Sequence, residues 1–248
     1  MLIHLATVLP AGILATLQFI PLIRYKALIV HRVCGYVALL LLVMGAASGF
    51  ALGRRSFGGD FSIQTGVVVL GASVLVSAAL AYYNIKRLQI DQHRKWMLRT
   101  WFYAGSIITL RILQIMMAKI ASDINQYHTV WSCNEVDFML KNATEVAQMY
   151  PLCATNQQNG YVVVPAIMTS AIGAGSSLRF AFGPALWMAL FIHATGIEIY
   201  IHLTPGEAER LRKVSYEKQL ERGAKYPGSM GTTSDRAGDN FGVRYRPH

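Results

Sequence analysis

The stretch VCGYVALLLLVMGAASGFAL, residues 33–52, has no charged side chain and is long enough to cross a lipid bilayer. A transmembrane helix needs about 20 mostly apolar residues. Four other segments of the same character occur along the chain, at residues 2–23, 66–83, 100–118 and 184–203. The sequence therefore predicts an all-α fold, a polytopic bundle of about five membrane-spanning helices.

The composition is typical of a membrane protein. Of the 248 residues, 53% are hydrophobic and 15% are charged, whereas soluble domains contain about 25% charged residues. Met1 is not followed by basic residues, and the first apolar segment is longer than the core of a cleavable signal peptide. We therefore interpret that segment as an uncleaved first span.

Basic residues between the predicted spans indicate the orientation, because Lys and Arg are retained in cytoplasmic loops. They cluster at residues 24–32, at residues 86–99 and after residue 203, whereas the other loops contain few. Five spans, with the amino terminus outside and the carboxyl terminus inside, bring all three clusters to the cytoplasmic face. There the net charge of +10 attracts anionic lipid. We expect the lipid bilayer, and no nucleic acid, as the partner of these charges.

This topology divides the chain into a transmembrane domain, residues 1–204, and a basic cytoplasmic tail, residues 205–248. Acidic and basic residues alternate at helical spacing over 207–222, which predicts a short charged helix. Residues 223–248 have too few apolar side chains to fold, so the tail is predicted to be partly disordered. The apolar segment 161–173 is too short to cross unaided. We expect a lumenal re-entrant or interfacial segment there, and the alternative is a sixth span.

The loop at residues 121–160 is predicted to face the lumen of an endomembrane compartment or the outside of the plasma membrane. It contains Cys133, Cys153 and, at Asn142, an Asn-Ala-Thr glycosylation acceptor. A disulfide between the two cysteines would stabilise the loop by about 2–4 kcal/mol. The alternative is two unrelated cysteines and a chance acceptor sequence. Cys34, near the reducing face, is expected to be free.

Three residues place a charged or titratable side chain deep inside the predicted spans: Arg111, His193 and Glu198. A charged group at bilayer depth costs about 2.5–3.5 kcal/mol, so it usually has a partner and marks a functional site. Arg111 and His193 lie at a similar depth, and Arg111 can reach Glu198 if its side chain extends toward the cytoplasmic face. These three are candidate catalytic residues. The alternative is a structural clamp between two helices.

Histidines form a second group of candidates near the cytoplasmic boundary. His31, His93 and His202 fall there on three different spans and can hold a transition metal. His31 and His93 can instead be the two axial ligands of a haem b, with Arg32 and Arg94 neutralising its propionates. The alternative interpretation is that these side chains only contact lipid head groups.

Several motifs together point to a known family. They are Gln18-Phe19 and Arg24 in the first span, HRVCGY at 31–36, GAASG at 45–49, DQHRKWMLR at 91–99 and TLR at 109–111. The chain thereby resembles a family of predicted integral membrane proteins, found in bacteria and fungi, whose function is unknown. The resemblance covers about residues 1–120, and Trp187 and Glu198 resemble its last span. It implies a helical bundle and no settled activity. The long cysteine-bearing loop departs from the short connection of bacterial members and suits a fungal member.

Three classes of function follow from these residues. The first is a metal- or haem-linked membrane oxidoreductase; a relay of two haems is disfavoured because the outer side offers only His4 and His128. The second is a membrane-embedded acid–base enzyme of the cyclase or isomerase type, acting on a lipophilic small molecule as in secondary metabolism. The third is a non-catalytic partner in membrane assembly or transport.

Overall fold

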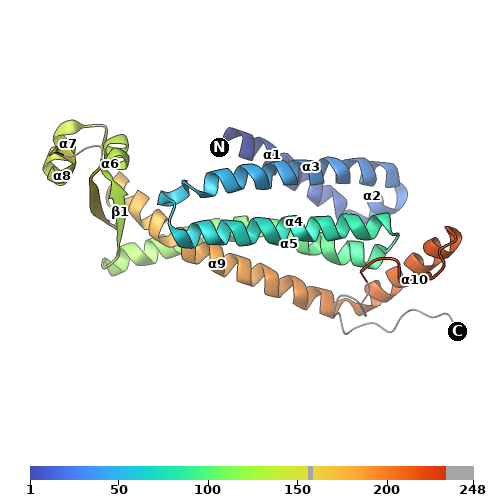
Figure 1. Ribbon diagram of the computed structural model, residues 1–248. Helices are drawn as coiled ribbons and strands as arrows, with labels where there is room; N and C mark the ends of the chain where they lie inside the picture. The colour runs from blue at the N-terminus through green and yellow to red at the C-terminus, as the bar shows by residue number, and fades with distance from the viewer. Residues whose placement is uncertain (156–158, 233–248) are drawn as a thin grey trace. The chain divides into compact units, whose positions relative to one another are not determined.

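The computed structural model describes residues 1–155 and 159–232, and most of this chain is helical (Figure 1). Four helices are long and apolar enough to cross a membrane: α3 (Leu28–Gly53), α4 (Phe61–Lys86), α5 (Ile90–Ile124) and α9 (Ala171–Leu203). A fifth apolar helix, α1 (Leu2–Gln18), has 17 residues, at the lower limit for a span. The prediction of a polytopic helical bundle is confirmed.

Two of the predicted spans differ from the helices at their ends. The first predicted span is divided, because α1 ends at Gln18 and a short helix, α2 (Pro21–Lys26), follows. Pro21 lacks a backbone N–H and has the fixed φ that suits the first position of a helix, so it begins α2. The last predicted span was too short, since α9 begins at Ala171 and includes Pro184 in its interior.

The chain forms two compact units. Unit 1 contains residues 1–51, 68–105 and the chain from Ile192 onward, and unit 2 contains residues 52–67 and 106–191. The long helices therefore contribute one part to each unit.

In unit 1 the helices pack as a series of neighbours. His4 of α1 bonds through Nδ1 to the carbonyl oxygen of Gly45 on α3 at 3.0 Å. The Tyr36 and Tyr82 rings meet between α3 and α4, with centroids 6.3 Å apart. A side chain at Gly45 would lie 2.7 Å from Val8, so glycine is needed for the close approach of α1 and α3. The α4–α5 and α5–α9 contacts involve candidate functional residues and are described below.

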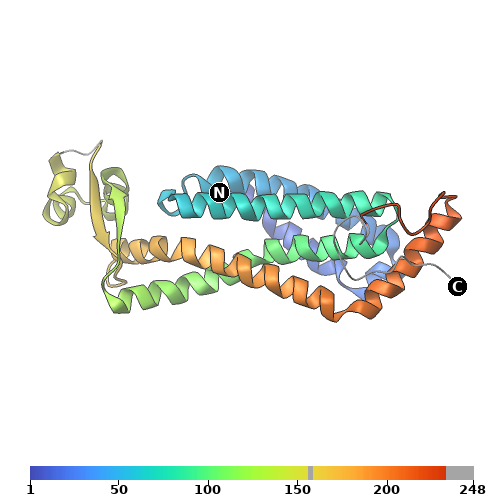
Figure 2. The ribbon, with the colours of Figure 1, turned by 60° about the horizontal axis from the view of Figure 1, so that its bottom comes forward.

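The predicted charged helix of the tail is confirmed as α10 (Pro205–Glu221), which follows α9 (Figure 2). The α10 helix attaches to the α4–α5 turn through buried polar side chains. The Ser215 hydroxyl accepts from Ile90 N at 2.9 Å, and Gln219 Nε2 donates to Gln89 Oε1 at 2.9 Å. Residues 223–232, which composition alone predicted to be unfolded, are held in part by Thr232, whose N–H donates to Asn84 Oδ1 at 2.9 Å. Residues 233–248 lie outside the described residues.

Unit 2 contains a small sheet and three short helices between α5 and α9 (Figure 1). The elements are β1 (His128–Ser132), α6 (Cys133–Leu140), α7 (Ala143–Met149), α8 (Pro151–Thr155) and β2 (Tyr161–Pro165), and the 3₁₀ turn η1 (Ser56–Gly58) belongs to the same unit. The two strands pair antiparallel, with Val130 opposite Val163. The apolar segment at 161–173 is therefore neither a sixth span nor a re-entrant helix, because its first five residues form β2 and its end begins α9.

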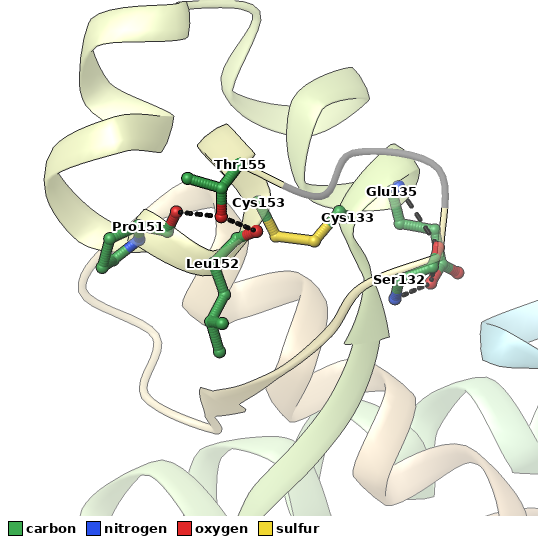
Figure 3. The surroundings of a disulfide bond; sticks show 7 residues. All are labelled: Ser132, Cys133, Glu135, Pro151, Leu152, Cys153 and Thr155. Atoms are coloured by element: carbon green, nitrogen blue, oxygen red, sulfur yellow. Dashed lines mark hydrogen bonds between the residues drawn. A yellow bond between two sulfur atoms is a disulfide. The ribbon is translucent and has the colours of Figure 1, made fainter.

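The predicted disulfide joins Cys133 and Cys153, and Cys34 is free, as expected (Figure 3). Both bonded cysteines are buried in a core that also contains Trp131 and Val136. The disulfide therefore ties α8 to the start of α6 within a hydrophobic cluster to which β1, β2 and the start of α9 also contribute.

Removal of this disulfide is expected to destabilise the loop. The bond closes a separation of 20 residues, for which chain-entropy models predict about 2–4 kcal/mol. In the Cys133→Ser/Cys153→Ser variant, limited proteolysis should cut within residues 121–160 at a protease concentration that leaves the wild type intact. The control variant Cys34→Ser should behave as the wild type does. Equal cleavage of all three proteins would show that the disulfide does not stabilise the loop.

Candidate functional site

The α4–α5 end of unit 1 brings together the two histidines proposed as haem ligands. His93, near the start of α5, bonds through Nδ1 to the carbonyl oxygen of Ala81 on α4 at 2.9 Å. A carbonyl can only accept, so Nδ1 carries the hydrogen and Nε2 is left with its lone pair. His31, near the start of α3, is close enough to interact electrostatically with His93. The two histidines are therefore close enough to influence one another, and a hydrogen bond orients the ring of His93.

Several buried polar atoms of unit 1 have no hydrogen-bond partner among the described residues. They include Gln18 Nε2, Arg24 Nε, His31 Nδ1, Gln92 Oε1, Trp96 Nε1 and Trp101 Nε1. An unsatisfied buried donor or acceptor costs about 1–3 kcal/mol, and most proteins have few of them. Arg24 and His31 also interact electrostatically, so this part of unit 1 has polar atoms that a ligand could use.

The arginines assigned to the haem propionates lie in different surroundings. Arg32 is exposed beside His31 and interacts with that ring electrostatically. Arg94 is directed toward α9, where its Nη2 lies 3.5 Å from Thr204 Oγ1 and its guanidinium is 5.8 Å from the centre of the Tyr200 ring. Arg24 of α2, which the sequence did not single out for this role, also interacts with His31.

His202 is not joined to the other two histidines as a metal site. Its Nδ1 bonds to the Glu198 carbonyl of its own helix at 2.7 Å. Within residues 1–155 and 159–232, no group of three or more His, Cys, Asp or Glu side chains could hold a metal ion. The three-histidine metal site therefore has no support among the described residues, and the His31–His93 site stays a prediction.

Glu198 has a partner that the sequence reasoning missed. Arg99 of α5 donates to both carboxylate oxygens, at 2.7 Å from Nε and 2.9 Å from Nη2. The Arg99 side chain is 10% exposed and lies over the Trp96 ring at 4.5 Å. His193, one helical turn away on α9, bonds through Nδ1 to the Phe102 carbonyl oxygen at 2.7 Å. The sequence interpretation placed Arg99 among the basic residues that contact lipid head groups. In the structure Arg99 on α5 and Glu198 on α9 lie side by side and form an ion pair.

Arg111 belongs to unit 2, where aromatic rings hold its charge. Its guanidinium lies 5.7 Å from the Phe57 ring centre and 5.5 Å from that of Phe182, and these two rings are stacked 4.4 Å apart. Its Nη1 donates to Gln114 Oε1 at 3.0 Å. Because His193 and Glu198 belong to unit 1, the grouping of all three as a catalytic site stays a prediction.

A family model described as "Predicted membrane protein (DUF2306)" matches residues 1–134, which is more than half of the chain. The chain belongs to the DUF2306 family. It is also similar to the "Ava biosynthesis cluster protein G" of Aspergillus versicolor, with 22% identity over 228 residues. That alignment covers 77% of this chain and 65% of the relative, so the chain spans less than two thirds of the relative's length. No solved structure matches the chain.

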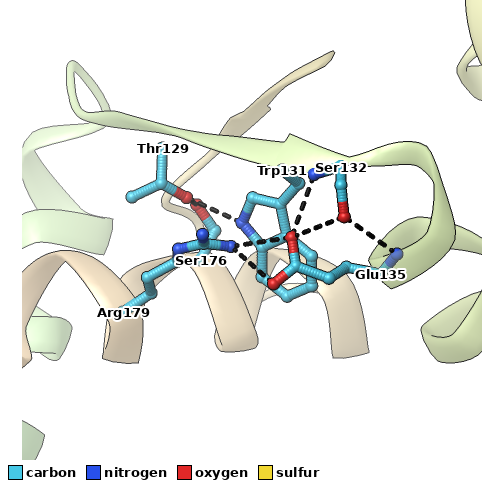
Figure 4. Close-up of polar contacts among 6 residues, drawn as sticks. All are labelled: Thr129, Trp131, Ser132, Glu135, Ser176 and Arg179. Atoms are coloured by element: carbon cyan, nitrogen blue, oxygen red, sulfur yellow. Dashed lines mark hydrogen bonds and ion pairs between the residues drawn. The ribbon is translucent and has the colours of Figure 1, made fainter. Parts of the chain in front are cut away.

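The DUF2306 match ends within the cysteine-bearing loop, and a polar cluster joins residues on both sides of that end (Figure 4). Arg179 of α9 donates to Glu135 at 3.3 and 3.4 Å and covers the Trp131 ring at 5.2 Å. Thr129 and Ser176 share a hydrogen bond of 2.7 Å. The cluster therefore fastens β1 and α6 to α9, and the sequence gave no periodic signal that would have indicated it.

The Arg99–Glu198 pair is expected to contribute to the stability of unit 1. Arg99→Met leaves the carboxylate of Glu198 without that partner and should lower the free energy of unfolding by about 1–3 kcal/mol. Glu198→Gln should cost less, because the amide oxygen still accepts. A matched control is Lys119→Met, which breaks an exposed pair with Asp123 and should change stability by about 0.5 kcal/mol at most. Equal melting temperatures of the Arg99 and Lys119 variants in detergent would contradict this role.

The Glu135 contacts should make the loop sensitive to acid. Burial opposes ionisation of Glu135, but the Ser132 N–H and hydroxyl and the Arg179 guanidinium outweigh it and hold its pKa below the ordinary value of 4.5. The ionised Glu135 side chain therefore stabilises the loop fully above pH 4.5, and this stabilisation is lost as the pH falls through the lowered pKa of Glu135. Its size stays below about 1 kcal/mol, because the side chain is 41% exposed. Melting curves at successive pH values should therefore differ between wild type and Glu135→Gln above pH 4.5 and converge in stronger acid.

Proposed function

We propose that this member of the DUF2306 family is a membrane redox protein that binds one haem b through His31 and His93. The observation that carries the proposal is the proximity of the two histidines, one of which is oriented by the hydrogen bond from His93 Nδ1 to Ala81. Two neutral imidazoles from different helices are a common axial ligand set for haem in membrane cytochromes. The bound haem would supply one-electron transfer.

The residues around the pair would serve the bound group in distinct ways. The Ala81 carbonyl fixes the tautomer of His93 and increases the basicity of Nε2, as partners of metal-bound histidines commonly do. Arg32 and Arg94 carry the positive charge for two propionates, as the sequence suggested. His93 is half-buried, so its surroundings would limit the access of water to the ring and would influence the reduction potential of a bound haem.

We further propose that this end of unit 1 faces the cytoplasm and that the loop at 121–160 faces the lumen or the outside. The basic residues of the α2–α3 and α4–α5 regions and of α10 support this orientation, and so does the disulfide, which requires an oxidising compartment. Asn142 is exposed and uses Oδ1 to cap α7, which leaves its amide nitrogen free to carry a glycan.

The similarity to a biosynthesis cluster protein supports a role in secondary metabolism. On this proposal, electrons pass through the His31–His93 site to or from a lipophilic small molecule in the bilayer. The identity to this relative is 22% and the alignment covers 65% of its length, so the similarity supports a role in secondary metabolism but no particular reaction.

A second candidate function is acid–base chemistry on a lipophilic substrate, with Arg111, His193 and Glu198 as the catalytic residues. The observation that favours it is the Glu198 side chain, which is 41% exposed while two nitrogens of Arg99 bind it. Such a carboxylate is oriented and still accessible from one side. The third class of function is a non-catalytic partner in membrane assembly or transport. It would apply if the polar contacts within the spans served only to pack the helices.

Purification after haem-replete expression tests the redox proposal. The wild type should show a Soret band and about one haem per chain by pyridine haemochrome, because two axial ligands hold the iron. His31→Ala and His93→Ala should each lose most of the bound haem. His202→Ala is the matched control, since that histidine bonds to its own helix, and it should keep the full amount. A wild type without a Soret band would refute the proposal.

A further inference from the structure

We propose that Gln18 and Arg24 bind the phosphate group of an anionic phospholipid where α1, α2 and α3 meet. This site would take a second ligand beside the redox centre, and the inference does not depend on haem binding. It arises from donors that the protein itself leaves unused.

The carboxamide of Gln18 is the most enclosed of these donors. The residue is 9% exposed, and its Nε2 has no hydrogen-bond partner among the described residues. Its Oε1 lies 3.4 Å from the position that a Cβ at Gly35 would occupy, so glycine allows the amide to pack against α3. Gly35 is one helical turn from His31, whose Nδ1 is also without a partner. The amide therefore occupies a prepared position and offers N–H groups that need an acceptor.

Arg24 supplies the charge. Its Nε is buried and has no hydrogen-bond partner in the part of the chain that the structure describes, while its Nη2 donates to the Tyr25 hydroxyl at 3.2 Å. That same hydroxyl accepts from Arg210 Nη2 at 2.8 Å, so two guanidinium groups meet at one phenol. Arg24 also interacts electrostatically with His31, which links the guanidinium to the region of Gln18.

Glu207 does not neutralise the positive charge around Arg24, because its carboxylate already binds Arg210. The hydrogen bond from Arg210, and then the charges of Arg94 and Arg24, hold the pKa of Glu207 below its ordinary value. The guanidinium groups of Arg210, Arg94 and Arg24 thus all interact electrostatically with the single carboxylate of Glu207. The excess of positive charge favours an anionic ligand, and N–H donors on a charged group bind phosphate oxygens strongly.

The surface beside these donors favours a lipid over a free phosphate ion. Phe19, Ile20 and Leu22 are 46%, 40% and 60% exposed, and they flank the turn between α1 and α2. A ligand whose phosphate contacts Arg24 would find apolar surface for its chains within a few residues. Van der Waals contacts between the acyl chains and this surface would add to the contacts of the phosphate, and inorganic phosphate cannot make them.

Gln18→Leu separates this proposal from a purely structural role. Leucine has a similar volume and no polar atom, so the unliganded variant should melt at the same temperature as the wild type or higher, because a buried unsatisfied group is gone. Its affinity for phosphatidic acid, measured by native mass spectrometry from delipidated detergent, should fall about tenfold. Arg24→Gln should weaken binding at least as much. Arg87→Gln, which removes an exposed arginine lying over Tyr83, is the matched control and should change the affinity less than about twofold.

Three further measurements complete the test. Diacylglycerol, which lacks the phosphate, should not bind, and inorganic phosphate should bind at least tenfold more weakly than phosphatidic acid. Equal affinity of Gln18→Leu and wild type, or equally tight binding of inorganic phosphate, would overturn the proposal. Exclusion of phosphatidic acid from haem-loaded protein would also overturn it, because the donors would then serve the propionates. A Soret band retained by Gln18→Leu would leave the redox proposal standing whatever the lipid result.

Discussion

A histidine bonded to a backbone carbonyl of the neighbouring helix is the recurring contact on which unit 1 depends. His4 bonds to Gly45, His93 to Ala81 and His193 to Phe102, and each bond joins a different pair of helices. Hydrocarbon offers no partner to a polar group, so a polar side chain in a span is stable only when a neighbouring helix satisfies it. The imidazole meets this condition through Nδ1.

His31 departs from this pattern, and the departure gives it functional weight. Its Nδ1 has no carbonyl partner in the part of the chain that the structure describes, although it is buried next to His93. A residue that served only to join helices would be expected to make the same bond as His4 or His193. His4 and His193 join helices of the bundle, whereas His31 has a ring nitrogen that a ligand could use. This difference supports the haem proposal and the phospholipid proposal.

The sequence predicted the features that depend on local composition. The spans followed from apolar length, the disulfide from two cysteines in one acidic loop, and α10 from the alternation of charges. It did not predict β2, because a strand is defined by its partner, and Val163 pairs with Val130 far back in the chain. It also missed the Arg99–Glu198 pair, because apolar length gives the depth of a residue but not the rotation of its helix. The assignment of His31 and His93 to one site rests on their common depth near the predicted cytoplasmic boundary, and it stays a prediction.

The attachment of α10 has a consequence for how the tail can behave. Ser215, Gln219 and Thr232 hold it to the α4–α5 turn mainly through hydrogen bonds between uncharged groups. Ser215 and Gln219 are buried, so separation would leave each of them in need of a new partner. Leu211 and Ala208 of α10 are buried as well, so detachment of the helix would also expose apolar surface. The carboxyl-terminal helix is therefore a folded part of unit 1 and not a loose arm.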